Sequence, residues 1–179
     1  MNKRLLHFEI ICFVISLVLG VIMHFVYEWS HYNRIVAMVC PVNESVWEHL
    51  KLIFVPYFIC SFFIYYKFRN HYKHIWAGKA LGVTAGLLFV VCFYYTYTGV
   101  IGKHCLFMDL LSFFLGTLLS YIVSFKIIKK DETILISEQI GFILFICYLV
   151  LFILFTVTPP RIPLFQDPVT KSFGINRLS

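Results

Sequence analysis

A short polar segment, residues 41–51 (PVNESVWEHLK), interrupts an otherwise apolar sequence and carries side chains that can do chemistry. Carboxylates and a histidine can transfer protons in general acid–base catalysis, and the same groups are metal ligands. We therefore predict that Glu48 and His49 are catalytic and that Glu44 helps to bind a substrate.

The same segment also has a structural interpretation. Ser45 followed by Glu48 fits a capping box at the start of a helix, and Asn43 is a competing cap. Lys51 is spaced to form an ordinary ion pair with Glu48 one turn away. On a helix, His49 points about 100° away from Glu48. The two residues need not serve one site, so both interpretations stay open.

Histidines elsewhere in the chain suggest a metal site. His24, Glu28 and His31 follow one another at helical spacing, which would let side chains of one helix face coordinate a metal such as zinc. We predict that the ligands are His24, Glu28, His49 and His104. The alternative is that His24 bonds to a neighbouring helix while Glu28 and His31 lie at the surface.

Asp109 is the third predicted catalytic residue, because it lies about one turn inside an apolar stretch. A carboxylate at the centre of a bilayer costs about 2.5 to 3.5 kcal/mol, and less near the interface, unless it has a partner or water. A partner is therefore expected. The candidates are His104, Lys103, Arg161 or a histidine of the first span.

Tyr97, Arg161 and Asp167 join Glu44 as predicted substrate-binding residues. Arg161 offers a planar fork of donors that fits a carboxylate or a lipid phosphate. The alternatives are an aromatic belt at the membrane interface for Tyr97, and a salt bridge from Arg161 to Asp167 or Glu44.

The composition identifies an all-α membrane protein. Apolar residues make up 60% of the 179 positions, charged residues only 13%, and the mean hydropathy is +0.85, all outside the range of soluble domains. A membrane helix needs about 20 apolar residues, and we predict a single domain, residues 1–179, with helical spans at 8–29, 50–66, 76–98, 105–125 and 139–158. The net charge of +6 comes from lysines and arginines spread through short loops, which fits membrane orientation rather than nucleic acid binding.

The loop charges also predict the orientation. Most basic residues near the ends of the spans lie on the side of the N-terminus, so the N-terminus is expected in the cytoplasm and the C-terminus outside. The basic residues counted on the N-terminal side are Lys3, Arg4, Lys67, Arg69, Lys73, Lys79, Lys126, Lys129 and Lys130. The outward tail, residues 159–179, begins with several prolines that favour extended backbone. We predict an ordered strap across the outer mouth of the bundle. Segment 41–51, the turn near residue 104 and the strap then share one pocket.

Small residues at helical spacing predict close packing between the first, third and fourth spans. The third span carries Gly78, Gly82 and Gly86, and the fourth has Gly116 flanked by serines. Of the six cysteines, those inside spans are expected to be packing residues, namely Cys12, Cys60, Cys92 and Cys147. A disulfide between Cys40 and Cys105 is left open.

Three motifs, PVNESVWEHLK at 41–51, YTYTG at 95–99 and PPRIPLFQDP at 159–168, carry a resemblance. Through them the chain resembles a family of small bacterial integral membrane proteins that is known only as a domain of unknown function. The resemblance covers nearly the whole chain. It implies a five-helix architecture in a bacterial cytoplasmic membrane, and it implies no catalytic residues.

Three functions remain open at this point. The first is a metal-assisted hydrolase or transferase that acts on a lipid or lipid-linked substrate in the outer pocket, with zinc as the candidate cofactor. The second is a non-enzymatic protein that binds, transports or senses a small molecule or ion in that pocket. The third is a structural or assembly protein. The chain has no GxSxG, HExxH or P-loop motif.

Overall fold

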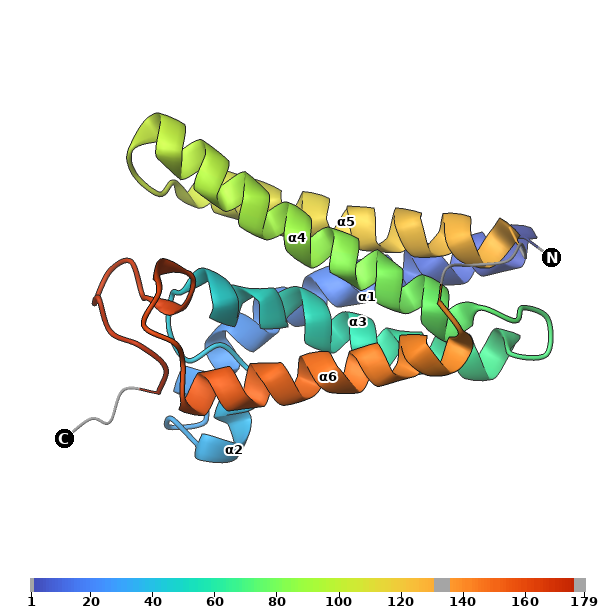
Figure 1. The fold of residues 1–179 in the computed structure, drawn as a ribbon, viewed down its shortest axis with the longest axis horizontal. Coiled ribbons are helices and arrows are strands. Elements are labelled where there is room, and N and C mark those ends of the chain that lie inside the picture. Colours follow the sequence, from blue (N-terminus) through green and yellow to red (C-terminus); the bar gives the residue numbers. More distant parts are fainter. Residues whose placement is uncertain (1, 131–135, 176–179) are drawn as a thin grey trace.

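The computed structural model describes residues 2–130 and 136–175, and every regular element in that part is a helix (Figure 1). The elements are α1 (Asn2–Trp29), α2 (Arg34–Ala37), α3 (Val46–Phe68), α4 (Ile75–Ile101), α5 (Leu106–Lys130), α6 (Glu138–Val157) and a 3-10 turn, η1 (Pro163–Phe165). Five of the helices are long and apolar enough to cross a membrane, namely α1, α3, α4, α5 and α6. The predicted all-α bundle with five spans is confirmed.

The helices extend beyond the predicted spans. α1 begins at Asn2 instead of residue 8, and α5 continues to Lys130 instead of residue 125. The prediction followed apolar residues only, whereas a helix can continue past the hydrocarbon layer because lysine and arginine extend their charged ends to water. The short α2 was not predicted. Its first turn is capped by Asn33, whose side chain accepts a hydrogen bond of 2.8 Å from the Ile35 N–H.

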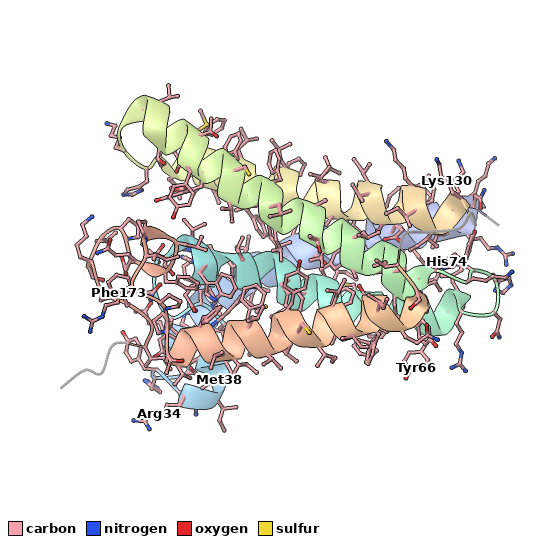
Figure 2. The ribbon with its side chains drawn as sticks, in the orientation of Figure 1. Arg34, Met38, Tyr66, His74, Lys130 and Phe173 are labelled. Carbon is pink, nitrogen blue, oxygen red and sulfur yellow. The ribbon has the colours of Figure 1, made fainter. Side chains whose placement is uncertain are left out.

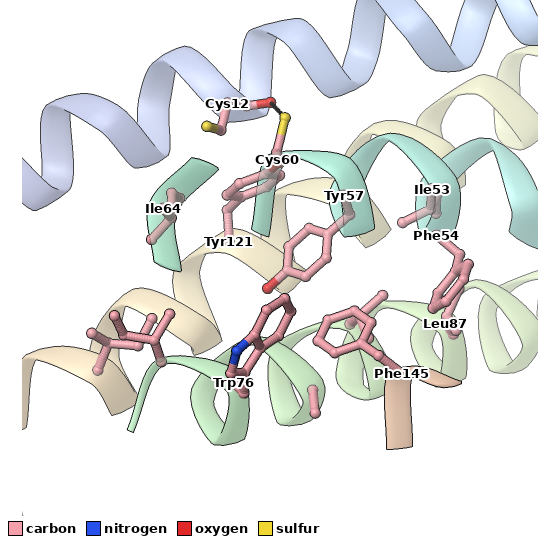
Figure 3. Close-up of a cluster of buried hydrophobic side chains, with 14 of the residues drawn as sticks. Cys12, Ile53, Phe54, Tyr57, Cys60, Ile64, Trp76, Leu87, Tyr121 and Phe145 are labelled. Carbon is pink, nitrogen blue, oxygen red and sulfur yellow. Dashed lines mark hydrogen bonds between the residues drawn. The ribbon is translucent and has the colours of Figure 1, made fainter. Parts of the chain in front are cut away.

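The five long helices run side by side, so that the described chain begins at one end of the bundle and the C-terminal strap lies at the other (Figure 1). α4 pairs most extensively with α5, while α3 contacts α1 and α4, and α6 contacts α4. An aromatic core fills the space around Tyr57, Phe54 and Phe145, and Trp76 packs against it (Figure 3). The strap and segment 41–51 therefore lie at the same end.

All six cysteines are free thiols, so the possible disulfide between Cys40 and Cys105 does not form. Cys60 donates a hydrogen bond of 3.7 Å to the carbonyl of Cys12, and both are buried in the core (Figure 3). Cys92 and Cys147 are exposed on the surface of the bundle, so the expectation that they pack inside is wrong for these two. Helical spans have a lipid side as well as a protein side, and hydrophobicity alone does not separate the two.

Glycines bring α4 and α5 into backbone contact, as their spacing predicted. A Cβ atom at Gly82 would lie 2.5 Å from the carbonyl oxygen of Ser120, and a Cβ atom at Gly86 would overlap the Ser120 hydroxyl and the Gly116 carbonyl. Gly20 brings α1 equally close to α3, since its Cβ would lie 2.7 Å from the Leu52 carbonyl oxygen. The small-residue stripes therefore fix how near these helices come.

We expect Gly86→Leu to destabilise the bundle by about 1 to 3 kcal/mol, because the added side chain forces α4 away from α5. Gly99→Leu is the matched control, since a Cβ atom at this exposed position of the same helix meets no atom within 4 Å. Equilibrium unfolding in mixed micelles measures both. Equal stability of the two variants would show that the contact at Gly86 does not limit the helix separation.

A buried ion pair inside the bundle was not predicted. The Lys79 ammonium lies 2.5 Å from the Glu9 carboxylate, and both residues are almost completely buried. The same ammonium donates to the Ser124 hydroxyl at 3.4 Å and lies about 5 Å from the ring centroids of Tyr57 and Tyr121. Lys79 had been counted among the basic loop residues, which is wrong. It joins α4 to α1 and α5.

Candidate functional site

Segment 41–51 is held in shape by its own polar side chains. The Ser45 hydroxyl accepts a hydrogen bond of 3.3 Å from the Glu48 N–H and thereby caps α3. Asn43 caps the turn before it, because its side-chain oxygen accepts from the Ser45 N–H at 2.9 Å. The predicted capping box is thus half formed. The Glu48 carboxylate does not return to Ser45 but bonds elsewhere.

Glu48 is buried and committed to structural contacts. Its carboxylate lies 2.7 Å from the Lys51 ammonium, which confirms the predicted ion pair one turn along the helix. It also accepts from the Val42 N–H at 3.1 Å and the Thr156 hydroxyl at 2.8 Å. Glu48 does not line either of the two cavities described below. Its predicted catalytic role therefore has no support, because its oxygens face α6 and the 37–42 loop instead of open space.

His24 of α1 comes together with Glu44 and His49 of segment 41–51. His49 Nε2 lies 3.4 Å from one Glu44 carboxylate oxygen, and His24 Nε2 lies 3.8 Å from the other. The two imidazole centroids are 5.3 Å apart. One donor atom from each residue falls within 4.8 Å of the others, a spacing that could hold a metal ion.

The ring of His49 is oriented for this role by the first turn of α3. Its Nδ1 lies 3.0 Å from the backbone carbonyl oxygen of Ser45. Since a carbonyl can only accept, Nδ1 carries a proton, and the neutral form of the ring presents the lone pair of Nε2 to Glu44 and His24. Protein metal sites commonly fix their histidine ligands in this way.

The three donors line one wall of a cavity of about 300 Å³. α1 and α5 flank it, α3 and α4 form its inner wall, and Pro168 and Val169 of the strap close one side. His104 and Asp109 also line it. The structure therefore brings segment 41–51, the turn near residue 104 and the strap to one pocket, as predicted. Most of the remaining lining is apolar.

Asp109 has two partners at the edge of this cavity. The Tyr97 hydroxyl donates a short hydrogen bond to one carboxylate oxygen, and His104 Nδ1 lies 3.9 Å from the other. His104 was among the predicted partners of Asp109, and Tyr97 was not. Tyr97 is buried beneath Asp109 and does not line the cavity, so its predicted contact with substrate has no support. About a third of the Asp109 side chain stays exposed to a bound molecule.

Three predicted site residues lie outside the converging donors. Glu28 is exposed and belongs to neither the cavity nor the metal-donor group, because the final turn of α1 carries it past His24. His104 lines the cavity but pairs with Asp109 and is not in the metal-donor group. Arg161 is exposed, and no ion pair to it occurs within residues 2–130 and 136–175. The third donor of the group, beside His24 and His49, is Glu44, which the sequence assigns to substrate binding.

Asp167 positions the strap and is not free to bind substrate. Its side chain accepts from the N–H groups of Val169 at 2.7 Å and Thr170 at 3.0 Å, and from the Glu44 N–H at 3.4 Å. Burial raises the pKa of Asp167, but these N–H donors outweigh burial and hold the pKa below its usual value. Asn43 adds a hydrogen bond of 3.0 Å to the Gly174 carbonyl. The strap therefore fixes the backbone that carries Glu44.

No curated protein and no solved structure is detectably similar to the chain. A family profile, by contrast, matches residues 2–175, which is nearly the whole chain and includes every element that builds the pocket. The protein therefore belongs to DUF6512, a family of unknown function.

Proposed function

We propose that this protein is a zinc-dependent hydrolase or transferase whose substrate is a lipid or a lipid-linked molecule. The observation that carries the proposal is the convergence of His24, Glu44 and His49 in one cavity. Two histidines and one carboxylate are a common ligand set of catalytic zinc, which leaves a further coordination position for water or substrate.

The donor set fits zinc in chemistry as well as in spacing. His49 has a lone pair on Nε2 because its Nδ1 faces the Ser45 carbonyl. The backbone of Glu44 is held by Asp167, so its carboxylate is presented without a large change in the chain. Zinc bound here would lower the pKa of water toward neutrality and polarise an ester or phosphoryl group.

Asp109 is the residue that we assign to proton transfer. It faces the cavity that also holds the three donors, and its carboxylate is partly exposed. Tyr97 donates a hydrogen bond to one oxygen and thereby orients the group. The other oxygen lies beside His104 and can accept a proton from water or a substrate hydroxyl, or return it to a leaving group.

The walls of the cavity support a substrate from the bilayer. Val21 and Phe25 of α1 and Leu106 and Leu110 of α5 line it, and all four side chains are also exposed on the surface of the bundle. The cavity therefore opens sideways between α1 and α5, where the protein meets hydrocarbon. An acyl or isoprenoid chain fits such an opening, and its polar head would reach the donors.

The distribution of basic residues supports an outward-facing site in a cell membrane. The end of the bundle opposite the strap gathers Lys67, Lys73, Lys126 and Lys129, with further basic residues at the start of α1. By the positive-inside rule this end faces the cytoplasm. The pocket and the strap then lie on the extracytoplasmic side, with the N-terminus inside.

Metal analysis of the purified full chain tests the proposal. We expect about one zinc per protein, and at least a roughly tenfold loss of zinc affinity in His24→Ala and in His49→Ala. His71→Ala is the matched control, because this exposed histidine lies at the other end of the bundle. A well-folded protein that retains no zinc after purification with zinc present would overturn the metal assignment and favour a non-enzymatic binding protein.

A further inference from the structure

A second cavity lies at the other end of the bundle, between the start of α1 and the end of α5. Its volume is about 440 Å³. Six apolar side chains form its walls, three from each helix: Leu6, Ile10, Phe13, Leu118, Ile122 and Phe125. Leu6, Ile10 and Ile122 are also exposed on the bundle surface, so the cavity is a groove open to the hydrocarbon.

The mouth of this groove is strongly basic. Lys126, Lys129 and Lys130 line it, all three are exposed, and none pairs with a carboxylate in the part of the chain that the structure describes. Figure 2 shows nitrogen-tipped side chains gathered around Lys130 at this end of α5. Asp131 and Glu132 follow directly in the sequence and lie outside the described residues.

The one acidic residue that lines the groove does not cancel this charge. Glu9 lies beside Ile10 and is almost completely buried, and one of its oxygens forms the ion pair with Lys79 at 2.5 Å. The two charges of that pair offset each other. The lysines at the mouth therefore form a basic rim above an apolar trough, and no carboxylate among residues 2–130 and 136–175 pairs with them.

We propose that this groove binds an anionic phospholipid of the membrane leaflet at this end of the bundle. Its phosphate lies among Lys126, Lys129 and Lys130, and one acyl chain lies in the trough between α1 and α5. Basic pockets between membrane helices suit anionic head groups, because the ammonium groups attract the phosphate while the tail stays in hydrocarbon. A zwitterionic lipid with the same tails binds less well, since its own cation meets the lysine rim.

This site is independent of the proposed catalytic cavity. The two cavities share no lining residue and lie toward opposite ends of α1 and α5. Loss of zinc binding would leave the lipid proposal untouched, and failure of the lipid proposal would leave the metal site untouched.

Native mass spectrometry of the purified full chain tests the proposal with phosphatidylglycerol and with phosphatidylcholine of the same acyl chains. We expect phosphatidylglycerol to bind at least about tenfold more tightly, because each lysine near the lipid surface adds to the attraction. In a variant carrying Lys126→Gln, Lys129→Gln and Lys130→Gln this preference falls to within about twofold. The matched control carries Lys3→Gln, Lys67→Gln and Lys73→Gln, three exposed lysines outside the groove, and keeps the preference.

Two further experiments distinguish the binding of a lipid from the binding of a free anion. Ile122→Trp fills the trough without changing a charge, so we expect it to weaken phosphatidylglycerol binding while size-exclusion chromatography shows a folded protein. Glycerol phosphate, which has the head-group charge without tails, should not compete. Equal binding of the two lipids, an unchanged preference in the groove variant, or full competition by glycerol phosphate would each overturn the proposal.

Discussion

Lys79→Met is expected to destabilise the protein by about 3 to 5 kcal/mol, because it removes one partner of a buried ion pair and leaves the other charged. The Glu9 carboxylate would keep no ammonium within reach, and one of its oxygens already has no hydrogen-bond partner in the described structure. The Ser124 hydroxyl and two tyrosine rings would also lose their contacts with the cation. α1, α4 and α5 all take part in this cluster.

Equilibrium unfolding in mixed micelles measures the loss, and a double variant identifies its cause. Glu9→Leu combined with Lys79→Met removes both charges, and we expect it to recover most of the stability, since well-packed apolar residues often replace a buried ion pair without loss. Lys73→Met, at an exposed position, is the control. A double variant as unstable as Lys79→Met would mean that packing around Lys79 matters and its charge does not.

Lys51→Met is expected to have an effect of similar size, about 3 to 5 kcal/mol, and to weaken the proposed metal site as well. The Lys51 ammonium is fully buried and donates to Glu48 at 2.7 Å, to Thr156 at 2.5 Å and to the backbone carbonyls of Ala37 and Cys40. It therefore holds α3, α6 and the loop after α2 together. Without it, the Glu48 carboxylate is buried without a cation.

The effect on metal binding distinguishes this variant from a general loss of stability. Lys51 does not line the cavity, but it anchors the loop that leads to Glu44. We expect zinc affinity to fall in Lys51→Met even at a temperature where the protein remains folded, as calorimetric titration would show. Lys103→Met, on the exposed turn after α4, should leave both stability and affinity unchanged. Unchanged zinc affinity in Lys51→Met would separate this network from the site.

Much of the architecture could be predicted because a membrane permits few kinds of spanning structure. A span must be a helix of apolar residues, so five apolar runs gave five helices. Five crossings place the two chain ends on opposite sides, which brings every second loop to the same end. Segment 41–51, His104 and the strap could be assigned to one pocket because they lie at the same end of the bundle, and no motif was needed for this.

The ligand set was harder to predict, because helical spacing tells which side chains share a face and not which face meets a neighbour. Glu28 follows His24 by one turn and was chosen for that reason, yet it is exposed. Glu44, which joins His24 and His49, lies in a loop. Its position depends on the hydrogen bond from its N–H to Asp167, more than a hundred residues later in the chain. No local pattern encodes that contact.

The buried pair of Glu9 and Lys79 leaves a recognisable signal in the sequence. Glu9 is the one acidic residue within the apolar run of α1 before His24, and a charge inside a membrane helix implies a partner. Lys79 was counted with the basic residues of the N-terminal side because it lies near the start of the predicted span 76–98. In the structure α4 begins at Ile75, within one residue of that prediction, and buries Lys79 after one turn. The boundary of the span was therefore predicted well, and the burial of a charged side chain close to it was not.

Because the pocket opens sideways between α1 and α5, its occupancy depends on the concentration of a ligand in the membrane and not on its concentration in water. A molecule that enters past Val21 and Leu106 arrives by diffusion within the membrane plane and never dissolves in water. Occupancy then depends on the mole fraction of that molecule among its neighbours in the leaflet. For the proposed enzyme, adding inert lipid at constant total amount of substrate would slow turnover by surface dilution, whereas changing the volume of the aqueous phase would have no effect.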